Sequence, residues 1–326
     1  MHLPLKKIFS CLLCCLGILL LISFAHTVEV SSQTVRISVV KSSDRTEYEQ
    51  TTNEIKSSLH QSSLSCNFSE VLLYSSTEDE TVFWRNLLRE NRPDLVIPVG
   101  TSATQSAIKN VQEVPIVFTM VLDDFESIQL KISSSKKDIN GVSLAIPVQE
   151  QFDILLEAMP FIKRIGLIYS TQPSQLYYTA RKITTAMNLQ LVTFEISNER
   201  NFPGALREIL PEIDILWMPP DAIIYNNPNI LRYVLRESFT NSVPTMAVSK
   251  HLAVAGAPLA LGVDYEDIGK QTADLVLKRL SHNYISTPVV ETPRRVILYI
   301  NRRVLSSLGI TIPGRVLEKA VPVESE

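Results

Sequence analysis

The sequence predicts an α/β protein made of two doubly wound, parallel-sheet lobes. From Thr34 onward, short runs rich in β-branched residues alternate with amphipathic helical patterns, which is typical of the βα units that build parallel sheets. These units form two series, each about a hundred residues long, which is the size of one domain. No tandem sequence repeat is visible, and the stretch at 133–143 is the expected crossover between the two series.

The first series holds predicted strands that are each followed by a helix. Acidic residues occupy the first turn of the helix expected at 77–91, where they favour the positive end of the helix dipole. The strands are expected at 34–40, 69–75, 94–100 and 114–122, and the helices at 46–61, 77–91 and 101–111.

The second series repeats this order. Pro173 suits the first turn of a helix, where its missing N–H is no loss. The strands are expected at 164–170, 189–196, 213–219, 243–249, 257–263 and 294–300, and the helices at 174–189, 202–210, 227–241, 250–256, 268–282 and 301–309.

The N-terminal residues 1–25 are expected to be a signal peptide. Lys6 and Lys7 precede an apolar run, and small residues stand before a cut after Ala25. An uncleaved leader that anchors the chain in the membrane is the alternative. Three of the four cysteines lie in this leader, so Cys66 alone remains after cleavage and no intrachain disulfide or cysteine metal cluster is expected. The net charge of -3 does not favour a nucleic-acid partner.

The candidate ligand-binding residues follow the predicted strands, because ligands of open parallel sheets bind outside the carboxyl ends of the strands. The turn from Gly100 into a helix offers backbone N–H groups to an anion, although Thr101 could instead only cap that helix. A carboxylate in a neighbouring loop could bind a ligand ammonium, with helix capping again the alternative. The candidates are Ser43, Asp44, Gly100, Thr101, Ser102, Asp123, Tyr169, Ser170, Thr171, Asp221 and Asp264, and the side chains that could line an apolar wall are Met120, Tyr169, Trp217, Met218 and Tyr225.

Enzyme chemistry finds little support in these loops. A hydrolytic site needs a nucleophile with a base in reach, and His251 is the only histidine near a predicted strand end. The sequence has no HExxH motif and no histidine pair at helical spacing. We therefore expect no catalytic residue, no metal and no cofactor.

Several segments together resemble the ABC transporter substrate-binding family that includes the TrpX-type proteins. They are "DLVIPVGTSATQSA", "VPIVFTMVLDD", "INGVSLAIPVQEQFDILLEAMPFIKRIGLIYS", "VPTMAVSKHLAVAGAPLALGVDYEDIGKQTADLVLKRL" and "INRRVLSSLGITIPGRVLEKA". The resemblance implies a type I periplasmic-binding-protein fold, in which three crossovers join the lobes and the ligand lies in a cleft between them. It matches Gly100, Thr101 and Ser102 to the family's binding turn, and Asp123 and Asp264 to its acidic positions.

The resemblance also implies a division of the chain and a function. Lobe 1 is expected to comprise 31–140 plus 258–285, and lobe 2 to comprise 141–257 plus 289–320. The expected protein captures a small polar, amino-acid-like solute in the periplasm and delivers it to an ABC permease and its ATPase. Two alternatives remain open: a periplasmic sensor module coupled to a membrane signalling protein, and an α/β enzyme such as a hydrolase or glycosyltransferase.

Overall fold

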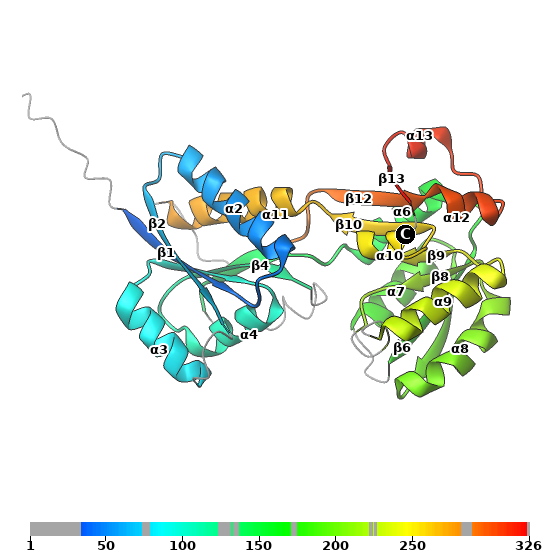
Figure 1. Cartoon of the computed structure of the whole chain (residues 1–326), viewed down its shortest axis with the longest axis horizontal. Helices are drawn as coiled ribbons and strands as arrows, with labels where there is room; N and C mark the ends of the chain where they lie inside the picture. Colours follow the sequence, from blue (N-terminus) through cyan, green and yellow to red (C-terminus); the bar gives the residue numbers. More distant parts are fainter. Residues whose placement is uncertain are drawn as a thin grey trace, which may run out of the picture. The chain divides into compact units, whose positions relative to one another are not determined.

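The protein contains two β-sheets, and the first of them is entirely parallel (Figure 1). The structure is a computed structural model that describes residues 34–73, 79–122, 132, 137–170, 175–221, 224, 227–281 and 289–324. Its strand order is β11-β5-β4-β3-β1-β2. The strands are β1 (Val35–Lys41), β2 (Cys66–Leu72), β3 (Leu95–Val99), β4 (Ile116–Val121), β5 (Ile139–Ser143) and β11 (Val290–Glu291).

Helices cover both faces of this first sheet because both faces of its central strands are apolar. The helices α2 (Thr46–Gln61) and α11 (Tyr265–Leu280) share one buried core with β1 and β3. The helices α3 (Glu80–Asn91) and α4 (Thr101–Asn110) share another with β4 and β5.

The second sheet has the order β13-β12-β10-β9-β8-β6-β7 and is parallel except where β12 runs antiparallel to β10. One face packs against α6, α7, α12 and α13, and the other against α8, α9 and α10. The strands are β6 (Arg164–Ser170), β7 (Gln190–Ile196), β8 (Ile215–Met218), β9 (Thr245–Ala247), β10 (Leu259–Val263), β12 (Val296–Asn301) and β13 (Val321–Val323). The helices are α6 (Val148–Ala158), α7 (Gln175–Ala186), α8 (Phe202–Ile209), α9 (Pro228–Thr240), α10 (Lys250–Val254), α12 (Arg302–Ser307) and α13 (Gly314–Leu317), with short 3₁₀ turns η1 (Glu199–Asn201) and η2 (Leu210–Glu212).

The two sheets are built on the same plan, which confirms the predicted fold class. The order β2-β1-β3-β4-β5 in the first recurs as β7-β6-β8-β9-β10 in the second. An Arg–Asp pair recurs as well: Arg36 at the start of β1 binds Asp94 before β3, and Arg164 at the start of β6 binds Asp214 before β8. Each pair is bidentate, with two guanidinium N–H groups donating to one carboxylate. The two series are thus repeats in structure.

The sheets divide the chain differently from the expected lobe boundaries. Strand β10 lies in the second sheet, whereas the expectation placed 258–285 with the first lobe. Strands β5 and β11 lie in the first sheet, whereas residues from 141 and from 289 were expected in the second lobe. In sequence β10 and α11 look like one βα unit. Their assignment to different lobes depends on long-range pairing, which periodicity does not reveal.

The unit Val35–Glu326 is compact, and the expected signal peptide at 1–25 lies outside the described residues. Within the described ranges, no helix is both long enough and apolar enough to cross a membrane.

Candidate functional site

In the first lobe, the loops after β1 and β3 meet at the point where the strand order reverses. Strands β2 and β3 lie on opposite sides of β1, so the connections leaving β1 and β3 diverge and open a crevice between them. The Ser42 amide donates to the Val99 carbonyl at 2.9 Å, and the Ser42 hydroxyl accepts from the Ala103 amide at 2.9 Å. Ser42 therefore connects the first loop to the start of α4.

Gly100 forms the tight turn at the beginning of α4. Its φ of +92° lies in a region that side chains with a Cβ rarely adopt, and its amide donates to the Thr119 carbonyl at 2.8 Å. A Cβ at this position would lie 2.6 Å from the Tyr48 hydroxyl oxygen and 2.7 Å from the Ser42 hydroxyl oxygen. Glycine is required here by backbone conformation and by space.

The first turn of α4 presents backbone donors. Gly100, not Thr101, is the N-cap residue, and Ser42 binds the Ala103 amide from outside the helix. Within the described part of the chain, the amides of Thr101 and Ser102 have no hydrogen-bond partner. The Thr101 hydroxyl accepts from the Leu122 amide at 3.3 Å. The turn can therefore hold an anion with two N–H groups at the positive end of a helix.

Ser43 and Asp44 stand beside this turn at the carboxyl end of β1. Ser43 is half-buried and Asp44 is exposed. Arg45 is the N-cap residue of α2, and its side chain makes no capping bond, so Asp44 does not cap that helix.

The equivalent crevice of the second lobe brings Ser170 and Asp221 together. They follow β6 and β8, which occupy the same places in the strand order as β1 and β3. The Asp221 carboxylate accepts from the Ser170 amide at 3.3 Å and from the Ile224 amide at 3.0 Å. The contact with Ser170 joins the two loops, whereas the contact with Ile224 lies within the loop after β8.

Tyr169 lies on the β7 side of this crevice. Its ring stacks on Tyr177 with centroids 5.0 Å apart, and its hydroxyl donates to Glu195 at 3.5 Å. Burial, and then the neighbouring Glu195 carboxylate, raises the pKa of the Tyr169 hydroxyl. Tyr169 thus packs on the outer part of its own lobe. Asp123 and Thr171, also expected at the site, lie outside the described residues.

Asp264 lies where β10 passes into α11. One carboxylate oxygen, Oδ1, accepts from the amides of Glu266 and Asp267 and so caps α11. The other, Oδ2, accepts from the Arg295 guanidinium at 2.9 Å. Both oxygens thus have partners within the protein.

Two adjoining cavities lie where the crossovers leave the sheets. The first has a volume of about 330 Å³ and a mostly apolar lining that includes Leu176 and Ile183 of α7. The second has a volume of about 440 Å³ and a more polar lining. The two cavities share Leu122, Leu144, Ile146 and Val248, and the polar one is also lined by Gln50, Ser249, Lys250, Asp264, Tyr265, Glu266 and Tyr299.

The aromatic wall differs from the one expected from sequence. Trp217, Met218 and Met120 are at most 2% exposed and belong to the cores, and Tyr225 lies outside the described residues. Tyr265 and Tyr299 line the polar cavity instead. Tyr265 directly follows the capping aspartate, which was the one sequence signal that could have identified it.

The tyrosines at the site remain protonated donors over a wide pH range. Burial raises the pKa of Tyr265, and the nearby Glu47 carboxylate adds to the effect. Burial and then Asp264 raise the pKa of Tyr299, and burial raises that of Tyr48. The Lys250 ammonium lies 5.9 Å from the centroid of the Tyr299 ring, within cation–π range. Among the residues that the structure describes, no cluster of three or more His, Cys, Asp and Glu could hold a metal ion.

Two repeated lobes, three crossovers and loops that meet at the carboxyl ends of the strands define the type I periplasmic-binding-protein fold. The chain belongs to the ABC transporter substrate binding protein family, whose model matches residues 51–324.

Individual proteins are similar to this chain in sequence or in structure. A tyrosine-binding protein from Clostridioides difficile is 25% identical over 68% of this chain, and the match spans 64% of that relative's length. The ligand-free, open structure of a substrate-binding protein with adhesive properties from Clostridium difficile is 18% identical, with a TM-score of 0.74 over 90% of this chain and 100% of that one. An ABC domain in complex with L-Trp from Streptococcus pneumonia is 19% identical, with a TM-score of 0.63 over 89% of this chain and 99% of that one.

Proposed function

We propose that the protein captures an amino acid with an apolar side chain and delivers it to the permease and ATPase of an ABC importer. Membership of the substrate-binding family supports solute capture. Two relatives support the substrate class, since one is named for tyrosine and another was solved with L-Trp. Proteins of this family are generally not enzymes, in line with a site that binds without turnover.

The observation that carries the proposal is the turn from Gly100 into α4. Its two unpartnered amides, on Thr101 and Ser102, suit a carboxylate, because backbone N–H groups at a helix start combine hydrogen bonds with a favourable dipole. The bond from the Leu122 amide to the Thr101 hydroxyl places this turn next to a residue that lines both cavities. A carboxylate at the turn would therefore direct the rest of the solute toward the cavities.

The apolar cavity supports an apolar side chain on the solute. Its volume of about 330 Å³ lies at the lower end of the range for small-molecule sites, roughly 300 to 1,000 Å³. Ile146, Leu176 and Ile183 line it. Burying an apolar group there gains free energy in proportion to the area removed from water, about 25 cal/mol per Å².

The proposed location is the periplasm, with residues 1–25 acting as the export signal. This rests on the sequence pattern of Lys6 and Lys7 before an apolar run and a small-residue cut after Ala25. Mass spectrometry of the N-terminus of the protein from its native cells tests it. A chain that begins at His26 agrees with export and cleavage, whereas a retained leader supports the membrane-anchored alternative.

The substrate class is tested with matched ligands. The purified protein is titrated calorimetrically with L-tyrosine, L-tryptophan, L-leucine and L-aspartate, and with the carboxamides of the first three. We expect an apolar amino acid to bind and to raise the melting temperature, as a ligand of the native state must. Its carboxamide, which lacks the anion, should bind at least about tenfold more weakly, since tenfold corresponds to 1.4 kcal/mol. Equal affinity for acid and amide would contradict the carboxylate assignment.

The backbone donor is tested with two variants of one residue. Thr101→Pro removes the amide while proline remains tolerated at the first position of a helix. Thr101→Val keeps the amide and removes the hydroxyl that Leu122 binds. We expect Thr101→Pro to weaken binding more than Thr101→Val does, with α4 intact by circular dichroism. Equal losses in the two variants would move the contact from the backbone amide to the hydroxyl, which both variants lack.

A further inference from the structure

We infer that Asp264 and Arg295 are positioning residues at the hinge between the lobes, and that Asp264 acts on binding through this hinge and not by contact with the solute. The inference rests on the proposed function for its binding readout, although the hinge itself can be tested without solute. It follows from where each crossover stops being attached to one lobe and becomes attached to the other.

The first crossover changes lobes between Ala145 and Ile146. The Ala145 amide donates to the Ser143 hydroxyl of β5 at 2.9 Å, so it is held by the first lobe. The Ile146 carbonyl accepts from the Gln151 side chain at 2.7 Å, and Gln151 in turn accepts from the Trp217 indole at 2.9 Å. Gln151 and Trp217 are both buried in the second lobe. Rotation can occur about the φ and ψ torsions of Ala145 and Ile146, which lie between these two held atoms, because the peptide bond itself stays planar.

The second crossover changes lobes between Val263 and Asp264. Val263 ends β10 and pairs with Val296 of β12 in the second sheet. Asp264 caps α11, which packs in the core of the first lobe. The next residue, Tyr265, is also tied to the first lobe, because its carbonyl accepts from the Thr51 hydroxyl of α2 at 3.1 Å.

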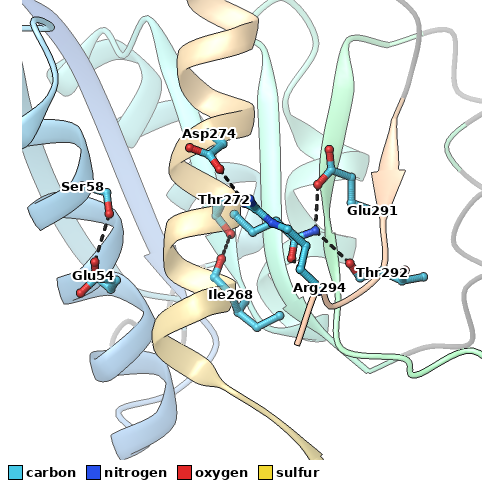
Figure 2. Close-up of polar contacts among 9 residues, drawn as sticks. Glu54, Ser58, Ile268, Thr272, Asp274, Glu291, Thr292 and Arg294 are labelled. Carbon is cyan, nitrogen blue, oxygen red and sulfur yellow. Dashed lines mark hydrogen bonds and ion pairs between the residues drawn. The ribbon is translucent and has the colours of Figure 1, made fainter. Parts of the chain in front are cut away.

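The third crossover is fastened to α11 as far as Arg294. Gln271 of α11 donates to the Glu291 carboxylate and to the Thr292 carbonyl, both at 2.8 Å, and accepts from the Arg294 amide at 3.3 Å. The Arg294 guanidinium binds Asp274 of α11 at 2.6 Å (Figure 2). Strand β12 of the second sheet begins at Val296. Arg295 is thus the single residue between Arg294, which is attached to α11 of the first lobe, and Val296, which begins a strand of the second sheet.

The Asp264–Arg295 ion pair joins the second and third crossovers at these two points of change. Its Oδ2–Nη1 distance is 2.9 Å, with the Asp264 side chain 22% exposed and that of Arg295 68% exposed. A rotation about the hinge must change the backbone of Arg295, because the residues on either side of it are held by different lobes. The ion pair therefore forms in some lobe arrangements and not in others, and it biases the equilibrium between them.

The two oxygens of Asp264 allow its roles to be separated. Asn retains an oxygen for the Glu266 and Asp267 amides and is a good N-cap, so Asp264→Asn keeps the cap of α11 and removes only the charge that Arg295 binds. Arg295→Gln removes the same ion pair from the other side. Asp94→Asn is the matched control, because it removes the charge of an ion pair with Arg36 that lies within the first lobe, at the amino ends of the strands and away from the crossovers.

We expect Asp264→Asn and Arg295→Gln to change the solute Kd in the same direction by about two- to fivefold, the range for an exposed ion pair. The double variant should show no more than either single change, and Asp94→Asn should leave the Kd unaltered. The solute used is the one that the calorimetric screen identifies. A loss of tenfold or more in Asp264→Asn alone would show direct contact between Asp264 and the solute, and no change in either variant would overturn the hinge role.

The second measurement needs no solute. In a full-length chain whose four cysteines are replaced by serine, Lys109→Cys on α4 and Arg207→Cys on α8 provide exposed attachment points for spin labels on the two lobes. The inter-label distance distribution is expected to shift in Asp264→Asn and Arg295→Gln but not in Asp94→Asn. An unchanged distribution in both hinge variants contradicts the inference even if solute binds. A shift in a protein that binds no solute leaves the hinge inference standing and removes the proposed function.

Discussion

Tyr48 lies directly against Gly100, so that a Cβ added to the glycine would come within 2.6 Å of the tyrosine hydroxyl oxygen. This contact joins the first turn region of α2 to the start of α4 and gives the loop a fixed shape. The glycine thus serves a close approach between side chain and backbone, in addition to its φ of +92°. Rigid binding groups of this sort cost less entropy when a ligand binds.

Replacing Gly100 with alanine should therefore destabilise the protein and weaken solute binding together. We expect a loss of about 1 to 3 kcal/mol in the free energy of unfolding, as for a strained backbone position. Urea denaturation measures it. Gly204 in α8 is the matched control, since a Cβ there meets nothing within 4 Å. Gly204→Ala should leave binding intact and stabilise by about 0.5 to 1 kcal/mol. Equal effects of the two changes would refute the assigned role of Gly100.

Gln151 offers a test of the buried polar contacts beside the first crossover. It is 3% exposed, donates to the Ile146 carbonyl and accepts from the Trp217 indole. Gln151→Leu leaves both partners buried without a hydrogen bond, and each such group costs about 1 to 3 kcal/mol. We expect a total loss of about 2 to 5 kcal/mol in chemical denaturation. Gln149→Leu, on the exposed side of the same helix, should change stability by less than about 0.5 kcal/mol.

The pH dependence of the free energy of unfolding should reveal how much the Arg36–Asp94 ion pair stabilises the protein. Hydrogen bonds from Arg36 hold the pKa of Asp94 below its ordinary value, against a smaller opposing effect of burial. Because the folded pKa is the lower one, the stabilisation is complete above the unfolded pKa of about 3.9 and is lost as the pH falls through the folded value. Asp94→Asn should therefore be less stable than the native sequence at pH 7, and this difference should shrink toward pH 2.

Denaturation midpoints between pH 2 and 7 provide the measurement for Asp94. Glu90→Gln serves as control, because Glu90 is 66% exposed and lies 4.0 Å from Arg89. Its stability should follow that of the native sequence at every pH. A difference for Asp94→Asn that stays constant with pH would mean that the carboxylate charge is not what stabilises this corner of the sheet.

The apolar cavity can be filled without disturbing the cores. Ile183 of α7 lines the cavity, whereas its neighbour Lys182 is exposed. Ile183→Trp should reduce solute affinity at least about tenfold by occupying space that the solute side chain needs. Lys182→Trp, on the same helix, should leave affinity unchanged, and calorimetry compares the two. Retained affinity in Ile183→Trp would place the solute side chain elsewhere.

Part of the site could be predicted from sequence because its signals are local. Gly100, Thr101 and Ser102 were identified from a strand, a glycine and a helix start that follow one another in the chain. Ser170 and Asp221 were identified as strand ends, and the structure brings them together. Tyr48 gave no such signal, since its role depends on contact with Gly100, which lies 52 positions further along the chain (100 − 48).

The sequence by itself determined the alternation of strands and helices and the positions of the polar loops, because strand and helix periodicity are properties of neighbouring residues. Only the tertiary structure decided that β10 belongs to the second sheet while α11 packs in the first lobe, and that Asp264 binds Arg295. Those outcomes depend on pairings between residues far apart in the chain. Such pairings are settled by which apolar faces and charges can be buried together, and no local pattern records them.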